Sequence, residues 1–472
     1  MATDNCRKER QLKAKTEESR ESLDTLPNSA EVDKAERKTI SSPSNQSETY
    51  IPKIERLVND YNIQVATMLV KRNKGAPGID GITVQEIEEV MKTTWPKIKQ
   101  EILEGTYRPQ PVRRVEIPKP DGSGVRQLGI PSVMDRIIQQ AIHQEVVLTF
   151  EPIFSQHSYG FRPHRSAHQA VLEAQKYIQE GCEWVVDIDL EKFFDRVNHD
   201  MLMARVARRV KDKKILLLIR RYLQAGVMED GLVKPTEEGT PQGGPLSPLL
   251  SNIMLDDFDK ELEKRGLRFA RYADDCNIYV KSEKAGNRVM ETASRYLTEK
   301  LKLKVNQKKS AVDRPWNRKF LGFTFTKGKE PDRIAIHESR IKRFKDKIRG
   351  KTKEMRGNNV AKSIRLHLMP IVRGWANYFG LAENSLAFGS LDGWIRRKIR
   401  GIFWRQWKDP RTRYKRLIAR GLKKRTAKST AYGGKGPWRM AASYGMQKAL
   451  SNVAIEALGY IPMKKIVAGL KN

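Results

Sequence analysis

The stretch Arg271-Tyr-Ala-Asp-Asp275 stands between two apolar runs, Phe269-Ala270 before it and Ile278 to Val280 after it. Two short apolar runs around a polar segment predict a β-hairpin, with Asp274 and Asp275 at its tip. Adjacent carboxylates repel one another unless a cation is bound, and hard oxygen ligands of this kind suit Mg²⁺. Taken alone, an Asp-Asp pair in a turn is more often a solvated loop.

A second apolar strand is predicted upstream, over Trp184 to Leu190. Side chains alternate between the two faces of a strand, so Asp187 and Asp189 share one face and the apolar residues share the other. A third carboxylate is needed to hold two metal ions, and Asp189 is the best candidate. Two ions about 4 Å apart activate a hydroxyl group and neutralise a transferring phosphate, which is the chemistry of nucleotidyl transfer.

Positive charge is concentrated in the C-terminal third of the chain. The 472 residues carry 90 Lys and Arg against 56 Asp and Glu, a net charge of +34, and residues 331–472 hold 34 of the basic and 8 of the acidic groups. This excess predicts a dedicated surface for nucleic acid. A solvated face on an amphipathic helix explains the pattern over Leu391 to Lys408 equally well, but it does not explain a charge of +26 over the whole region.

Membrane insertion and secretion are not expected. No apolar run approaches the roughly 18 residues of a transmembrane helix, and the N-terminus lacks a hydrophobic segment of the signal-peptide type. The three cysteines, Cys6, Cys182 and Cys276, are far apart in the sequence. They form neither a disulfide framework nor a zinc ligand set, which fits a reducing compartment.

Three strings follow the order and spacing of the sequence blocks of reverse transcriptases: VVDIDLEKFFDRVNH from Val185, TPQGGPLSPLLSN from Thr240 and RYADD from Arg271. Further strings narrow the resemblance, namely NKGAPGIDG, RRVEIPKPDG, RQLGIPSVMDRIIQQAI, SYGFRPHRSAHQA, LKVNQKKS and FLGF. Together they resemble the reverse transcriptases encoded by group II introns, from about residue 65 to residue 410.

The resemblance implies an α+β right-hand polymerase fold, with fingers and palm, an α-helical thumb (domain X) and a small basic C-terminal domain. It divides the chain into four parts: a disordered tail at 1–50, fingers and palm at 51–335, the thumb or maturase domain X at 336–410, and a basic DNA-binding domain at 411–472. The tail prediction also rests on composition, because no aromatic residue precedes Tyr50.

The resemblance also assigns the site. It makes Asp189, Asp274 and Asp275 the catalytic carboxylates, and it places two Mg²⁺ ions at Asp189, Leu190, Asp274 and Asp275. Asp189 matches the family pattern better than Asp187 because a second Asp of the block stands six residues later, as Asp195 does here.

Four residues are expected to bind the incoming nucleotide. Lys119 and Arg126 match residues that hold its triphosphate, Gln242 matches one that lies along it, and Phe194 matches an aromatic gate against the ribose 2′ hydroxyl. A rigid ring under the sugar clashes with one extra oxygen, so dNTPs would be preferred. By residue type alone, Phe194 is also an ordinary core residue and each cation an ordinary surface charge.

Contacts with nucleic acid are expected from seven cationic residues: Lys74, Arg162, Lys309, Arg373, Arg396, Arg397 and Arg400. The last three lie on the basic face of the helix predicted over Leu391 to Lys408.

The implied function is an RNA-directed DNA polymerase that copies RNA into cDNA from dNTPs, an RNA template and a DNA primer. It would also bind its intron RNA as a maturase for splicing and retrohoming into target DNA, in the bacterial cytoplasm, associated with the nucleoid or a ribonucleoprotein. The last cysteine is Cys276 and the last histidine is His367, so the chain resembles the bacterial class C branch without an HNH nuclease.

Two alternatives stay open at this point. One is a maturase with an idle polymerase site, and the other is a reverse transcriptase of a retron, diversity-generating or CRISPR-associated lineage. The sequence leaves open the intron RNA, the DNA target, the processivity and whether the protein is a monomer or a dimer.

Overall fold

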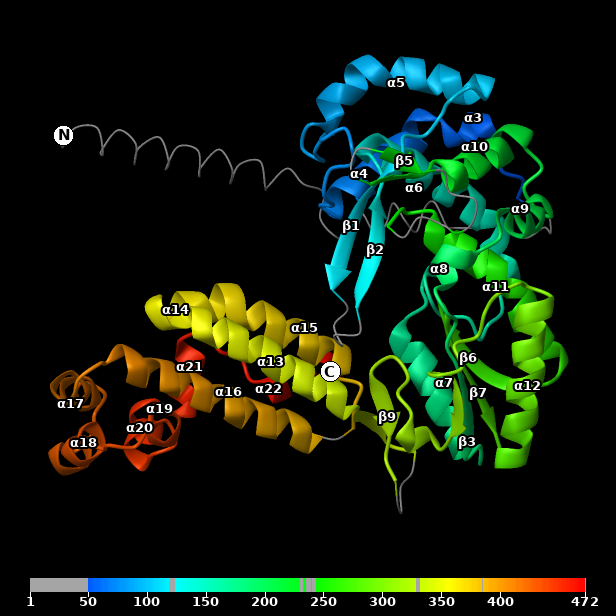
Figure 1. Ribbon diagram of the computed structural model, residues 1–472. Coiled ribbons are helices and arrows are strands. Elements are labelled where there is room, and N and C mark those ends of the chain that lie inside the picture. Colours follow the sequence, from blue (N-terminus) through cyan, green and yellow to red (C-terminus); the bar gives the residue numbers. More distant parts are fainter. Residues whose placement is uncertain are drawn as a thin grey trace, which may run out of the picture. The chain divides into compact units, whose positions relative to one another are not determined.

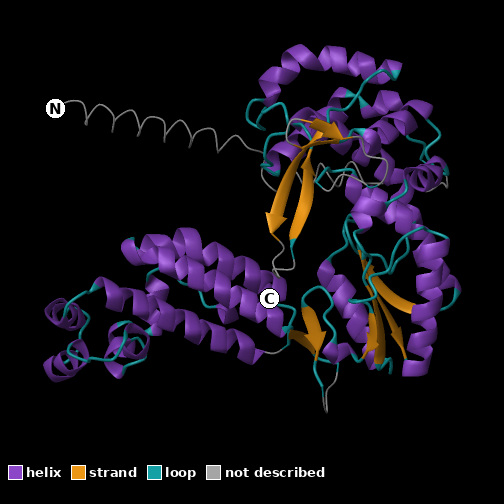
Figure 2. Ribbon diagram, in the orientation of Figure 1, coloured by secondary structure: helices purple, strands orange, loops and turns teal. Residues whose placement is uncertain are grey.

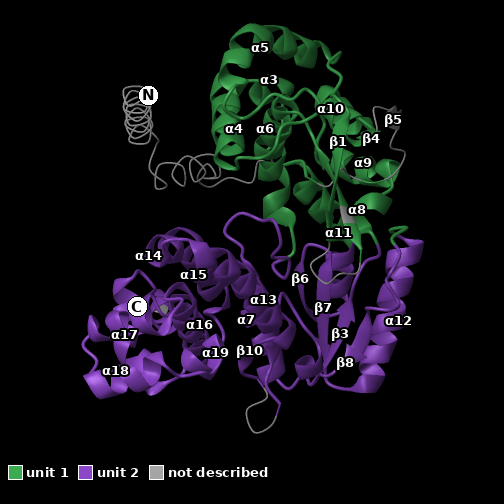
Figure 3. Cartoon of the chain, turned by 60° about the vertical axis from the view of Figure 1, so that its left-hand side comes forward, with its two compact units in different colours: residues 1–155, 192–257, 301–303 green, residues 156–191, 258–300, 304–472 purple. Residues whose placement is uncertain are grey.

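The computed structural model describes residues 50–118, 124–229, 232–234, 239, 243–327, 332–383 and 385–471. The chain folds into two compact units, coloured separately in Figure 3. The first unit comprises residues 1–155, 192–257 and 301–303, and the second comprises residues 156–191, 258–300 and 304–472. The tail predicted at 1–50 lies outside the described residues except for Tyr50, and the domain limits near 335 and 410 stay predictions.

The first unit is mainly helical and contains one small sheet with strand order β2-β1-β4-β5. Its strands are β1 (Val112–Pro118), β2 (Val125–Ile130), β4 (Val227–Glu229) and β5 (Leu232–Lys234). Its helices are α3 (Ile54–Leu57), α4 (Asp60–Arg72), α5 (Ile87–Glu104), α6 (Val133–Phe150), η1 (Glu151–Ile153), α8 (Phe193–Arg196), α9 (His199–Ala207), α10 (Lys213–Gln224) and the first part of α11 (Ser247–Lys264). The hairpin predicted between Val112 and Pro131 is confirmed as the antiparallel pair β1 and β2.

Helix α6 lies at the centre of this unit, and nearly all of its residues are buried. The side chain of Ser132 caps its N-terminus by accepting a hydrogen bond from the backbone of Asp135. The buried Asp135 carboxylate in turn accepts hydrogen bonds from the hydroxyl groups of Tyr107 (2.8 Å) and Tyr222 (3.1 Å). These bonds tie α6 to α10 and to the segment before β1.

The second unit is built on a four-stranded antiparallel sheet with strand order β6-β7-β3-β8. The strands are β6 (Arg268–Tyr272), β7 (Asp275–Val280), β3 (Trp184–Ile188) and β8 (Ala311–Asp313). Helices α7 (Ala167–Gln179) and α12 (Glu283–Glu299) flank this sheet on opposite sides in Figure 1. Gly286 lets α12 lie close to the sheet, because a Cβ atom there would stand 2.5 Å from the Val312 side chain.

The rest of the second unit is largely helical, as Figure 2 shows in purple. A two-stranded sheet, β9 (Phe323–Phe325) with β10 (Ile334–Ile336), precedes these helices, and η2 (Pro315–Asn317) precedes that sheet. The longer helices are α13 (Glu338–Glu354), α15 (Met369–Phe379), α16 (Ser385–Gln406), α17 (Pro410–Ile418), α18 (Lys424–Ala431) and α22 (Met463–Lys471). The shorter ones are η3 (Met355–Gly357), α14 (Val360–Ser363), the π-helical turn η4 (Ile364–Leu368), α19 (Pro437–Met440), α20 (Tyr444–Ala449) and α21 (Asn452–Ala457).

One hydrophobic core runs through the second unit from α7 to α22. Aromatic rings fill its centre, where Trp375 stacks on Phe344 with ring centroids 4.4 Å apart and lies 4.8 Å from Phe379. The helix predicted over Leu391 to Lys408 is α16, and its residues Ile395 and Ile399 are fully buried, as predicted. The α+β class and the helical C-terminal region are therefore confirmed. Among the helices of the described ranges, we find none that combines the length and apolar character needed to span a membrane.

Candidate active site

The pairing of β3 with β7 brings carboxylates from distant parts of the sequence to one place. Its last pair joins Ile188 to Cys276, and the same antiparallel register, continued by one position, sets Asp189 opposite Asp275. Directly opposed residues have Cβ atoms about 5 Å apart. Asp274 precedes Asp275 in the turn between β6 and β7. The hairpin predicted around this turn is confirmed, and the three predicted carboxylates share one end of the sheet.

The carboxylates at this end of the sheet perturb one another. The side chain of Asp275 is exposed to solvent. Even so, the protein atoms around its carboxylate desolvate it, and this effect, followed by the charges of Asp274, Asp187 and Asp189, raises the pKa of Asp275 to about 7. A divalent cation relieves repulsion of this kind, so the donor set fits Mg²⁺ chemically. As their side chains stand, no three His, Cys, Asp or Glu residues of the described ranges converge on one point.

Two cations from the segment after α12 compensate part of this negative charge. Arg318 binds Asp187 through Nη2 (2.6 Å) and Nε (3.0 Å), and the Nζ atom of Lys309 lies 3.7 Å from a carboxylate oxygen of Asp189. The ion pair with Arg318 gives a physical reason why Asp187, on the same strand face as Asp189, is the less suitable metal ligand. The sequence reading missed Arg318, which is 131 residues from its partner.

Backbone hydrogen bonds hold the end of β3 in position. The amide of Asp189 donates to the Ser310 hydroxyl (3.0 Å), and the carbonyl of Asp189 accepts from the amide of Asn306 (2.8 Å). The amide of Glu191 donates to the carbonyl of Lys304 (2.8 Å). These bonds flank Leu190 and do not use its own carbonyl group, so that carbonyl remains suitable as the metal ligand that the resemblance predicts.

A buried ion pair supports the turn formed by Ala273 and Asp274. Arg271 and Asp259 are almost completely buried, and they contact each other through Nε (2.6 Å) and Nη2 (2.5 Å) of the arginine. The same guanidinium donates to the carbonyl of Ala273 and to the hydroxyl of Ser158, both at 2.8 Å. Arg271 therefore connects the helix α11, the loop before α7 and the turn that carries Asp274.

The turn also depends on Gly160. Ala273 adopts a positive φ of 58°, and its amide nitrogen would lie 2.3 Å from a Cβ atom at position 160. The neighbouring atoms are backbone, so they cannot rotate away as a flexible side chain can. Any side chain at position 160 would displace the turn.

We expect Gly160→Ala to lower the unfolding free energy by about 1–3 kcal/mol, the usual cost of overpacking, and to reduce any activity that depends on Asp274. Gly350→Ala is the control, because Gly350 lies in α13 with nothing within 4 Å of its would-be Cβ atom. Thermal unfolding and activity measurements on both variants test this. Equal effects at the two positions would contradict the role given to Gly160.

The predicted nucleotide-binding residues belong to the first unit or lie outside the described residues. Phe194 lies on α8 and is partly exposed, whereas Phe193 beside it is buried. Gly239 has a φ of +94° and packs on the backbone of Phe194. A Cβ atom at position 239 would lie 2.8 Å from the carbonyl oxygen of Phe194. Arg126 lies in β2 opposite Ile117, and Lys119 and Gln242 lie outside the described residues.

Two of the seven cations expected to contact nucleic acid are buried, and a contact of these two with nucleic acid stays a prediction. Arg162 donates to the carbonyl of Ser158 (2.9 Å), and Arg400 donates to the carbonyl of Leu450 (2.8 Å). Their guanidinium groups therefore serve the fold and have little surface to offer a phosphate. The remaining five are exposed or partly exposed: Lys74, Lys309, Arg373, Arg396 and Arg397.

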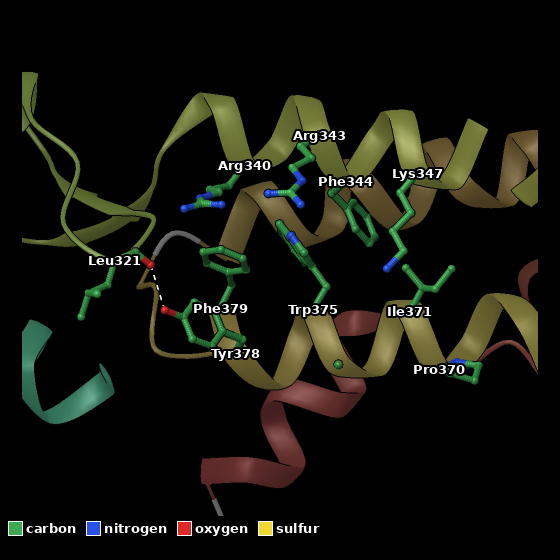
Figure 4. Close-up of a pocket in the computed structure, with 11 residues that line it drawn as sticks. Leu321, Arg340, Arg343, Phe344, Lys347, Pro370, Ile371, Trp375, Tyr378 and Phe379 are labelled. Carbon is green, nitrogen blue, oxygen red and sulfur yellow. Dashed lines mark hydrogen bonds between the residues drawn. The ribbon is translucent and has the colours of Figure 1, made fainter. Parts of the chain in front are cut away.

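A groove of about 450 Å³ lies between α13 and α15. Figure 4 shows Arg340, Arg343 and Lys347 of α13 facing the aromatic side chains of α15 across it. Among the residues that the structure describes, no acidic one lines the groove. The hydroxyl of Tyr378 donates to the carbonyl of Leu321 at 2.9 Å. Cations beside aromatic rings suit a nucleic-acid backbone.

Comparison with known proteins agrees with these features. Residues 117–325 match the family described as reverse transcriptase (RNA-dependent DNA polymerase), and residues 341–421 match the group II intron maturase-specific domain. The chain is 34% identical over 287 residues to protein YkfC of Escherichia coli (strain K12), covering 52% of this chain and 75% of YkfC. The chain belongs to the reverse transcriptases encoded by group II introns. This confirms the family resemblance that the sequence strings predicted.

A relative that is named as a group II intron product is similar over a smaller share of its length. The intron-encoded protein LtrA of Lactococcus lactis subsp. cremoris is 37% identical over 236 residues, which cover 50% of this chain but 39% of LtrA. Among solved structures, a partial Cas6-RT-Cas1--Cas2 complex shares 24% identity over 54% of this chain and 43% of that chain, with a TM-score of 0.34. Reverse transcriptases as a family use divalent metal ions, and the maturase-specific domain implies binding of group II intron RNA.

Proposed function

We propose that this group II intron reverse transcriptase copies RNA into DNA at the end of the β6-β7-β3-β8 sheet, with Asp189, Asp274 and Asp275 as its catalytic carboxylates. The observation that carries the proposal is the β3–β7 register, which sets Asp189 opposite Asp275 beside Asp274. The raised pKa of Asp275 is the second support: desolvation is its main cause, and the repulsion from Asp274, Asp187 and Asp189 that adds to it marks a site suited to cations.

The three carboxylates and the carbonyl of Leu190 would hold two Mg²⁺ ions. When bound, these ions supply a more acidic primer hydroxyl and neutralise negative charge on the transferring phosphate. The chain's own residues keep the ligands in place: Ser310 and Asn306 fix the backbone of Asp189, and Arg271 fixes the turn of Asp274. Arg318 neutralises Asp187, so the charge left for the ions is concentrated on the other three carboxylates.

The test of this proposal is cDNA synthesis on a primed RNA template with dNTPs, with and without Mg²⁺. We expect extension that requires the ion. Extension in the presence of a chelator, or none with Mg²⁺, would refute the proposal. RNA affinity measured on the same preparation separates an idle polymerase site from a misfolded protein.

We expect Mg²⁺ to raise the unfolding temperature of the metal-free protein by a few degrees at pH 8, and much less at pH 5.5. The pKa of Asp275 lies at about 7, above the value in an unfolded chain, so this group stabilises the fold at low pH and that contribution is lost as pH rises through 7. The ion restores it at pH 8, whereas protons compete at pH 5.5. Because Asp275 is exposed, solvent screening limits the gain to on the order of 1 kcal/mol.

Differential scanning fluorimetry over a Mg²⁺ titration at both pH values measures this effect. Asp274→Asn/Asp275→Asn is the matched variant, in which the ion should no longer shift the unfolding temperature. A shift of equal size in that variant would place the bound ion elsewhere.

We propose that Lys119, Arg126, Phe194 and Gln242 bind the incoming dNTP. Phe194→Ala should admit ribonucleotides, because the smaller side chain removes the clash with the 2′ hydroxyl. We expect discrimination between dNTP and rNTP to fall about 10- to 100-fold, the range of one steric contact in a pocket. Single-nucleotide incorporation kinetics measure it, with buried Phe193→Leu as the control for local packing. Unchanged sugar selection in Phe194→Ala would refute the gate.

The proposed nucleic-acid partners are the intron RNA, an RNA template with its DNA primer, and target DNA. The cationic groove between α13 and α15, together with exposed Arg373, offers a surface for them. We further propose a maturase role in splicing and retrohoming, and membership of the bacterial class C branch. An intron domain V hairpin next to the reading frame supports this assignment, and a spacer array or variable-repeat cassette there would overturn it.

A further inference from the structure

A second cavity lies among the C-terminal helices α16, α18, α19 and α20, which are drawn in orange to red in Figure 1. Its volume of about 780 Å³ is within the range of roughly 300–1,000 Å³ that is typical of ligand pockets. Within the described ranges, four cationic side chains and no acidic one line it: Arg397, Arg425, Lys435 and Arg439. Glu456 is the one acidic residue among residues 411–472, against 15 basic ones. The cavity therefore favours an anionic ligand.

The uncharged side chains that line the cavity indicate which kind of anion it fits. Thr426 and Ser429 of α18 present hydroxyl groups, which donate readily to phosphate oxygens. Tyr444 also lines the cavity, and 68% of its surface is exposed. An exposed aromatic ring beside phosphate donors is the combination that binds a nucleotide of a single strand, by stacking on its base.

Three glycines line this cavity, and two of them allow close packing beside it. A Cβ atom at Gly445 would stand 2.1 Å from the Thr430 hydroxyl, and one at Gly433 would stand 2.7 Å from Met440. Both positions therefore allow α18 to approach the segments after it. Gly434, by contrast, has nothing within 4 Å of its would-be Cβ atom, so it leaves the cavity open.

One cationic wall of the cavity is held rigidly before any ligand arrives. The Nε atom of Arg397 donates to the carbonyl of Trp438 (3.0 Å), and its guanidinium lies 3.9 Å from the centre of the Trp438 ring. A preorganised cation loses less conformational entropy on binding than a free surface side chain does. This distinguishes the cavity from a merely solvated basic surface.

We propose that this cavity binds one unpaired nucleotide of a single-stranded nucleic acid. Arg425, Lys435 and Arg439 would contact its phosphates, and Tyr444 would stack on its base. A paired base cannot leave its stack to reach Tyr444 without an energetic cost, so a duplex would contact only the cationic rim. The inference deepens the proposed binding of nucleic acid by this chain and rests on it, and it concerns the region 411–472 that the sequence predicts to bind DNA.

Fluorescence anisotropy of the full chain with three labelled probes tests the proposal: a 12-nucleotide DNA strand, the RNA of the same sequence, and the corresponding 12-base-pair duplex. Tyr444→Ala should weaken single-strand binding about 5- to 100-fold, the range for loss of one stacked base, and leave duplex binding within twofold. Tyr432→Ala is the matched control, because Tyr432 is 59% exposed and does not line the cavity. Tyr432→Ala should change neither single-strand nor duplex affinity.

A second pair of variants tests the cavity itself without removing any contact. Gly434→Val adds a side chain at a position that lines the cavity, whereas Gly436→Val adds one nearby at a position that does not line it; neither added Cβ atom would meet a described atom within 4 Å. We expect at least a fivefold loss of single-strand affinity in the first and less than twofold in the second. The phosphate contact is tested in the same way by Arg425→Gln, with Lys424→Gln as its control. Both residues lie on α18, but Lys424 does not line the cavity.

The proposal is overturned if Tyr444→Ala and Tyr432→Ala behave alike, or if Tyr444→Ala weakens duplex and single strand equally. The two single-stranded probes show whether the bound strand is DNA, RNA or either. Extension of a primer that is fully annealed to a short RNA template is measured in parallel. Failure of primer extension in the unsubstituted protein would refute the polymerase proposal. If Gly434→Val still extends the primer but has lost affinity for the single strand, the cavity is supported as a separate site.

Discussion

We expect primer extension on an RNA template to fall at least about 10²–10³-fold when Asp275 is replaced by asparagine, while the protein stays folded. The amide has the shape of the carboxylate but carries no charge, so the proposed Mg²⁺ site loses one of its anionic ligands. Removal of one positioned electrostatic group at a reacting centre costs about 10²–10³ in rate, and loss of a metal ligand should cost no less. Single-turnover extension with saturating dNTPs measures the effect.

The matched control for Asp275→Asn is Asp313→Asn, on β8 of the same sheet. The Asp313 carboxylate accepts hydrogen bonds from the amide of Arg314 and from Asn317, and an amide oxygen can replace it there. We expect near-normal extension in the control and unchanged RNA affinity in both variants. Extension above a tenth of the normal rate in Asp275→Asn would refute the catalytic role, and loss of RNA affinity would show that the two functions are not separable.

Arg271→Met lowers the free energy of unfolding by about 3–5 kcal/mol, the largest loss of stability that we expect for a single change in this protein. The arginine is 1% exposed and donates to Asp259, Ser158 and the carbonyl of Ala273. Its removal leaves the fully buried Asp259 carboxylate without its countercharge, which is the costly way to break a buried pair. Urea unfolding followed by circular dichroism measures the loss.

The double variant Arg271→Met/Asp259→Leu separates the cost of the unpaired charge from the loss of the turn contact. We expect it to recover at least half of the stability, because an apolar pair of similar size replaces the ion pair. Extension should stay impaired in the double variant, since the hydrogen bond to Ala273 is still missing. Equal stability of the single and double variants would show that Asp259 is not the source of the loss.

Local pattern predicted several of the strands and helices correctly. The hairpin of β6 and β7, the strand β3 and the helix α16 follow from apolar periodicity and short polar breaks, which are properties of neighbouring residues. The choice of Asp189 over Asp187 came from the family resemblance, and the structure adds its physical reason, the ion pair between Asp187 and Arg318.

Pairs distant in the sequence were not predictable in this way. Nothing in the local pattern around Arg318, Arg162 or Arg400 distinguishes these residues from the many solvated cations of a chain with 90 Lys and Arg. Each is committed to a partner within the chain, and the partner is known only once the chain is folded. The burial of Arg162 and Arg400 was not predictable from the sequence for this reason.

The order of residues alone therefore indicated the hairpin of β6 and β7, the strand β3, the helix α16 and the basic C-terminal third, because each is encoded by composition or by spacing along a few turns or strand residues. The resemblance of the sequence strings indicated the family, and with it came the prediction that Asp189, Asp274 and Asp275 are the catalytic carboxylates. Tertiary structure alone decided which charges meet: the opposition of Asp189 and Asp275, the neutralisation of Asp187, the fit of Gly160 beneath the turn and the cavity beside Tyr444. Coulombic and packing energies depend on distance in space, and that distance is set by strand register and helix packing rather than by separation along the chain.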